Sequence, residues 1–126
     1  MSTVHANSPR DAFSRLEAMV LMSDLQIPSR VILQQLAGAI KLVLQVSRLQ
    51  DGSRKIVSIA EVLGVKDDRI DVRDVFLFER TGLTAAGKVQ GRFRSSGETP
   101  TILERLKVSG IELPAAVFDE VVEVNQ

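Results

Sequence analysis

The spacing of apolar residues changes twice along this chain, and that change constrains the fold more than any other feature. Apolar residues first recur at helical spacing, as in Phe13, Leu16 and Val20. Over residues 40–47 they alternate with polar residues instead, which is the period of a half-buried strand. Helical spacing returns after Thr99. The order helices, strands, helices predicts an α+β fold rather than a wound parallel sheet.

Each of the four prolines stands where a helix would begin, and a capping Ser or Thr precedes two of them. Two N-terminal and two C-terminal helices are therefore predicted. They cover residues 9–20, residues 28–38, residues 100–110, and a last short stretch from Pro114 that contains Val117, Phe118, Val121 and Val122.

An antiparallel β-meander of about four strands is predicted between these helices. The strands cover residues 40–47, 54–65, 70–79 and 88–94, and turns rich in Asp and Gly separate them. We therefore expect a single segment of 126 residues with three parts. These are a helical part (1–39), the β-meander (40–97) and the C-terminal helices (98–126).

Composition excludes several classes of protein. Cysteine is absent, which excludes disulfide frameworks and thiolate chemistry, and His5 is the single histidine, so no multi-histidine metal site is expected. The formal net charge is zero, which argues against a nucleic-acid partner. No apolar run reaches the ~18 residues of a membrane helix, and the first residues do not read as a secretory signal. We expect a cytoplasmic protein.

One string of residues is similar in sequence to a phosphate-binding loop. Gly82-Leu83-Thr84-Ala85-Ala86-Gly87-Lys88 matches its first seven positions, but Val89 stands where a magnesium-binding hydroxyl is required. The residues that follow alternate like a strand, whereas the phosphate loop must open a helix. The string is therefore predicted to be a glycine-bearing hairpin loop.

The basic residues near the predicted hairpins are a weaker candidate site. No aromatic residue interleaves with them, and many carboxylates share the same region, so a mixed, solvated sheet face is the better interpretation. The residues are Arg48, Arg54, Lys55, Arg92 and Arg94. For His5, the residues alone favour a solvated N-terminal histidine, and a role in anion binding at the following helix start is the alternative.

A resemblance changes the weight given to His5. Nearly the whole chain resembles, in order, the C-terminal part of the type II/IV secretion ATPases, in the CpaF-like branch that powers tight-adherence (Flp) pilus assembly. The most specific segment is the histidine box, Ser2-Thr3-Val4-His5-Ala6-Asn7-Ser8-Pro9-Arg10-Asp11-Ala12. Further matches lie at residues 27–30, 47–54, 61–64, 76–79, 91–94, 102–106 and 110–114.

This resemblance implies part of a RecA-like P-loop ATPase domain in a hexameric motor. Such motors hydrolyse ATP with Mg²⁺ at the cytoplasmic side of the inner membrane and act on the platform proteins of a pilus or secretion system. The resemblance implies that His5 lies near the nucleotide and couples the state of the γ-phosphate to conformation. Thr3 and Asn7 would support it.

The chain also departs from the family. The phosphate-binding loop (Walker A), the aspartate box and the acidic Walker B motif precede the histidine box in the family and do not occur in these 126 residues. Because those parts supply most of the catalysis, we expect a fragment that is inactive alone and binds no nucleotide tightly. An upstream ATPase fragment is a possible partner. The alternatives are a non-enzymatic interaction module that binds the parent motor or its membrane platform, and a remnant without function.

Overall fold

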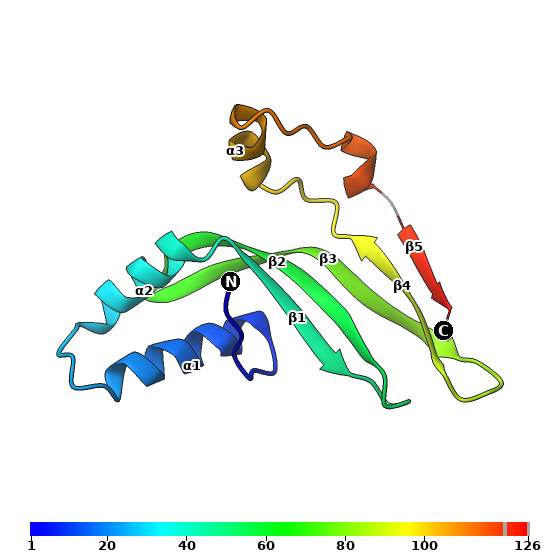
Figure 1. Ribbon diagram of the computed structural model, residues 1–126, viewed down its shortest axis with the longest axis horizontal. Helices are drawn as coiled ribbons and strands as arrows, with labels where there is room; N and C mark the ends of the chain where they lie inside the picture. The colour runs from blue at the N-terminus through cyan, green and yellow to red at the C-terminus, as the bar shows by residue number, and fades with distance from the viewer. Residues whose placement is uncertain (120, 126) are drawn as a thin grey trace. The chain divides into compact units, whose positions relative to one another are not determined.

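The computed structural model describes residues 1–119 and 121–125, and it confirms the α+β class (Figure 1). In that range the chain contains three α-helices, one 3-10 helix and five strands. In chain order they are α1 Pro9–Leu21, α2 Ser29–Ala39, β1 Leu42–Arg48, β2 Arg54–Lys66, β3 Arg69–Leu83, β4 Val89–Ser95, α3 Ile102–Val108, the 3-10 helix η1 Ala115–Phe118 and β5 Val121–Asn125.

The five strands form one sheet in the order β1-β2-β3-β4-β5, so each strand pairs with its neighbour in sequence. Short hairpin turns connect the strands from β1 to β4, as predicted for an antiparallel meander. The chain forms two compact units, and the long strands β2 and β3 contribute to both. The first unit comprises Met1–Gln45 and Ala60–Arg73, and the second comprises Val46–Ile59 and Asp74–Gln126.

The core of the first unit forms where α1 and α2 pack on the strands. Its buried residues are Phe13 from α1, Leu33 and Ala37 from α2, Val62 from β2 and Ile70 from β3. Partly buried aliphatic side chains pack around them. Burying each large side chain contributes roughly 1.5–3 kcal/mol to folding. The apolar face predicted for the first helix is therefore buried at Phe13 and half-buried at Leu16 and Val20.

The core of the second unit contains a stack of aromatic rings. The ring of Phe76 on β3 lies 5.8 Å from that of Phe93 on β4 and 5.9 Å from that of Phe118 in η1, measured between centroids. Val75 and Val89 are almost fully buried. The stack therefore joins the 3-10 helix to two strands that lie far from it in sequence.

The predicted last helix is wrong in its second half. Ala115–Phe118 forms one 3-10 turn, and Val121 and Val122 lie in β5, which pairs with β4 through Arg94↔Val121 and Phe93↔Val122. Three of the five residues of β5 are valines, whose branched side chains favour strands over helices. The meander consequently has five strands rather than about four, and one C-terminal α-helix replaces the predicted two.

The string that is similar to a phosphate-binding loop forms the hairpin between β3 and β4, as predicted. The Thr84 N–H donates to the carbonyl of Lys88 at 2.7 Å, and the Gly87 N–H donates to the carbonyl of Thr84 at 2.9 Å. Gly87 has a φ of +78°, which glycine adopts without strain. Val89 then begins a strand, so no helix start faces this loop.

Across residues 1–119 and 121–125, none of the helices combines the length and the apolar character needed to span a bilayer.

Candidate functional site

The three predicted site residues lie in the segment that precedes α1, within the first unit. Thr3, His5 and Asn7 are exposed, whereas Val4 and Ala6 between them are half-buried. All three polar side chains are therefore open to solvent.

Two hydrogen bonds anchor the backbone of the segment next to His5. The carbonyl of Ala6 accepts a hydrogen bond from the Gln45 side-chain amide of β1 at 2.9 Å. The N–H of Asn7 donates to Oδ2 of Asp11 in α1, also at 2.9 Å. The main chain beside His5 is thus tied to a strand on one side and to a helix on the other.

The start of α1 is a well-formed cap. The Ser8 hydroxyl accepts a hydrogen bond from the Asp11 N–H at 3.0 Å, and Pro9 occupies the first turn. The pKa of the Asp11 carboxyl lies below its usual value, first because it accepts the Asn7 N–H and then because Arg15 donates to it at 3.0 Å. The charged form of Asp11 therefore helps to hold the segment that carries His5.

This arrangement leaves the His5 imidazole facing solvent. Within the described ranges, no hydrogen bond or ion pair engages that side chain. An imidazole donates and accepts hydrogen bonds, as do the Thr3 hydroxyl and the Asn7 amide beside it. The cluster can therefore contact polar atoms of a molecule that approaches from solvent.

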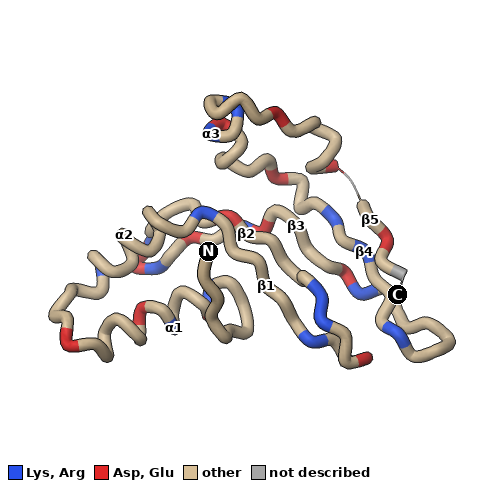
Figure 2. Tube along the Cα trace, in the orientation of Figure 1, with Lys and Arg blue, Asp and Glu red and all other residues tan. Residues whose placement is uncertain are grey.

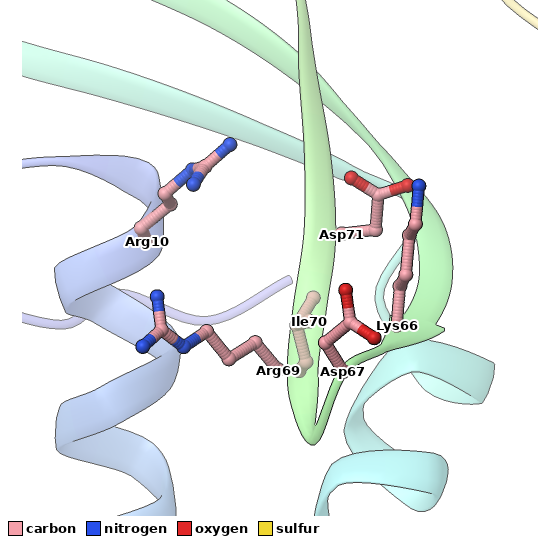
Figure 3. A pocket seen from close by; sticks show the side chains of 6 residues that line it. All are labelled: Arg10, Lys66, Asp67, Arg69, Ile70 and Asp71. Atoms are coloured by element: carbon pink, nitrogen blue, oxygen red, sulfur yellow. The ribbon is translucent and has the colours of Figure 1, made fainter.

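A second candidate site was not predicted from the sequence. The first unit holds an open hollow of about 350 Å³ next to α1, shown in Figure 3. It is lined by Arg10, Lys66, Asp67, Arg69, Ile70 and Asp71. In the sequence, the Asp67-Asp68 turn indicates part of this site, because a two-residue hairpin places Lys66 and Arg69 opposite each other.

Two of the five basic residues near the hairpins, Arg92 and Arg94, are paired with one carboxylate. Glu79 on β3 binds Arg92 at 2.6 Å and Arg94 at 2.8 Å, and these two bonds lower the pKa of its carboxyl. Arg92 also lies opposite Glu123 of β5 in the strand register. Figure 2 shows basic and acidic positions interspersed along these strands. Arg92 and Arg94 are therefore both engaged by carboxylates.

Compared with known proteins, the chain matches no family model and no curated protein.

Proposed function

We propose that this chain is the C-terminal part of an ATPase motor of the type II/IV secretion class, in the branch that powers tight-adherence pilus assembly. The resemblance of the segment from Ser2 to Ala12 to the histidine box of that class supports the proposal. In this proposal the chain forms the C-terminal portion of a RecA-like domain. It works in a hexamer at the cytoplasmic side of the inner membrane and acts on platform proteins there.

One observation carries the proposal: His5 is exposed, while the backbone beside it is anchored to two elements. A contact between the imidazole and the γ-phosphate of a bound nucleotide would displace this segment when the phosphate is released. The bond from Ala6 to Gln45 would pass that displacement to β1, and the bond from Asn7 to Asp11 would pass it to α1. Thr3 and Asn7, which are also exposed, would add polar contacts.

The nucleotide-binding part of the motor supplies the remaining chemistry. It holds the phosphates in a glycine-rich loop and positions Mg²⁺, and these features lower most of the barrier to phosphoryl transfer. Residues 1–126 contain neither that loop nor the acidic motif that holds the metal. The chain is therefore expected to lack ATPase activity alone and to contribute His5 to a site completed by another polypeptide part.

A binding experiment tests this proposal. The chain is titrated into the nucleotide-binding part of a tight-adherence ATPase, loaded either with ADP or with a non-hydrolysable ATP analogue. We expect tighter binding to the ATP-analogue form, because His5 gains a contact with the γ-phosphate only there. We expect His5→Ala to abolish the difference between the two forms. Equal affinities of the unmodified chain for both forms would contradict the proposed coupling.

A specific observation also favours the alternative, a non-enzymatic interaction module. The edge strand β1 exposes three apolar side chains, those of Leu42, Leu44 and Val46. Exposed apolar edge strands favour pairing with other chains. An interaction module would bind the parent motor or its membrane platform independently of nucleotide. His5→Ala would leave that binding unchanged, so the same titration separates the two functions.

A further inference from the structure

Two arginine side chains lie at the hollow beside α1 without a carboxylate partner. Arg10 is in the first turn of α1, and Arg69 is the first residue of β3. Figure 3 shows both side chains on the α1 side of β3. Among residues 1–119 and 121–125, no carboxylate forms an ion pair with either guanidinium. Because arginine is permanently charged, two such groups at one hollow favour an anion from outside the chain.

The backbone fixes the place of both arginines. Asp67 and Asp68 have φ values of 52° and 57°, which form a tight left-handed turn between β2 and β3. Ile70, next to Arg69, is buried in the same core as Phe13 of α1. The helix start that carries Arg10 is capped by Ser8. The two guanidinium groups therefore extend from well-held positions on two packed elements.

The other charged residues of the hollow lie differently. Lys66 adds a third positive charge, and Asp67 and Asp71 add two negative charges, so three basic against two acidic residues leave a net charge of +1. Figure 3 shows the two carboxylates and Lys66 on the opposite side of β3 from the arginines. The positive charge of the two arginines therefore lies on the α1 side of β3.

We propose that this hollow binds a phosphate group, with Arg10 and Arg69 as its principal ligands. The planar guanidinium presents paired donors that match two oxygens of a phosphate, and such charge-assisted hydrogen bonds are about twice as strong as neutral ones. A volume of about 350 Å³ accommodates a phosphate with part of the group attached to it. Free phosphate and the phosphate of a nucleotide share this chemistry. The site depends on the fold of the first unit and not on the proposed motor function.

Titrations of the full chain test the site. Amide chemical shifts are followed while inorganic phosphate, AMP or ATP is added. Each addition replaces chloride, so that the ionic strength stays constant. We expect saturable shifts at Arg10, Arg69 and Ile70. Saturation by inorganic phosphate identifies free phosphate as a sufficient ligand, whereas saturation by AMP or ATP alone identifies a nucleotide. Absence of saturation with all three would overturn the proposal.

Variants locate the binding. We expect Arg10→Gln and Arg69→Gln each to weaken binding about tenfold or more, because each removes a charge-assisted pair. Arg30→Gln is the matched control, since Arg30 is exposed on α2 and does not line the hollow. Arg69→Lys keeps the charge but loses the paired N–H donors of the guanidinium, so this variant should bind phosphate with intermediate affinity. Equal weakening by Arg30→Gln, or unchanged affinity in Arg10→Gln and Arg69→Gln, would contradict the assignment. The circular dichroism spectrum of each variant checks its fold.

Discussion

The ring of Phe78 on β3 lies against the backbone of Gly91 on β4. A Cβ atom built on Gly91 would come within 2.3 Å of Cζ of Phe78 and 2.6 Å of the carbonyl oxygen of Glu79. Gly91 is itself buried, and it lies opposite Arg80 in the strand register. The ring therefore occupies the space that any other residue at position 91 would need.

This contact predicts that Gly91→Ala destabilises the fold. The added methyl would displace the ring or the strand, and overpacking of this kind costs about 1–3 kcal/mol. Gly38→Ala in α2 is the matched control, because nothing lies within 4 Å of its Cβ position. There alanine should stabilise the helix by about 0.5–1 kcal/mol. Urea unfolding of the two variants measures both effects. A Gly91→Ala variant that is as stable as wild type, or more stable, would contradict the close packing of Phe78 on Gly91.

The aromatic stack predicts that Phe118 stabilises the second unit although it lies in a single 3-10 turn. Phe118 is 7% exposed, and its ring stacks on that of Phe76. Phe118→Ala should lower the free energy of unfolding by about 3–5 kcal/mol. Phe118→Leu retains much of the volume and should cost less, with the stacking contribution of roughly 0.5–1.5 kcal/mol lost. Equal urea midpoints for wild type and Phe118→Ala would contradict this packing.

Asp51 predicts a pH dependence of stability. Its carboxylate accepts hydrogen bonds from the Ser53 hydroxyl at 2.5 Å, the Val89 N–H at 2.8 Å and the Ser53 N–H at 2.9 Å. These bonds, led by that of the Ser53 hydroxyl, lower the pKa of Asp51 well below its usual value of 3.8. A lowered pKa in the folded state means that the stabilisation is fully present above the unfolded pKa. It is lost as the pH falls below that value toward the folded pKa.

Asp51→Asn isolates this contribution from those of Asp11 and Glu79, whose pKa values are also lowered. The variant should be less stable than wild type at about pH 6, and the difference should shrink as the pH falls below about 4. Urea unfolding at several pH values from about 6 down to about 2 measures the difference. A difference that stays constant across this range would show that the charge of Asp51 does not contribute.

The cap of α1 predicts a smaller effect near the candidate site. Ser8→Ala removes the acceptor of the Asp11 N–H and should cost about 1 kcal/mol. Ser14→Ala is the control, because Ser14 is exposed within the same helix and alanine is favourable there. Thermal unfolding followed by circular dichroism compares the two. A Ser14→Ala variant that loses as much stability as Ser8→Ala would contradict the capping role.

The first unit could be predicted from its sequence because its local signals agree. Ser8 and Pro9 mark the start of α1, and Phe13 and Leu16 recur on the face that is buried. The C-terminal region could not be predicted in the same way. Val121 and Val122 lie three to five residues from Val117 and Phe118, which imitates a helical face. The strand forms because the edge of β4 provides backbone partners for it, and that long-range pairing has no local signal.

The two candidate sites also differ in how much of each could be predicted from the sequence. His5 is identified by a contiguous motif, and its exposure follows from the alternation of Thr3, His5 and Asn7 with apolar neighbours. The arginine hollow joins residues 10 and 69, which are close only because α1 packs on the β2–β3 hairpin. Nothing in the spacing of the two arginines along the chain indicates that contact.

The release of phosphate from ATP tests the central claim most directly. The chain is mixed with the nucleotide-binding part of a tight-adherence ATPase, and phosphate release is compared with that of each part alone. We predict turnover above the sum of the separate parts, its loss in His5→Ala, and no change in Arg30→Gln. Turnover that does not exceed the separate parts, or that is equal with His5→Ala, would contradict the role of His5 as part of the motor.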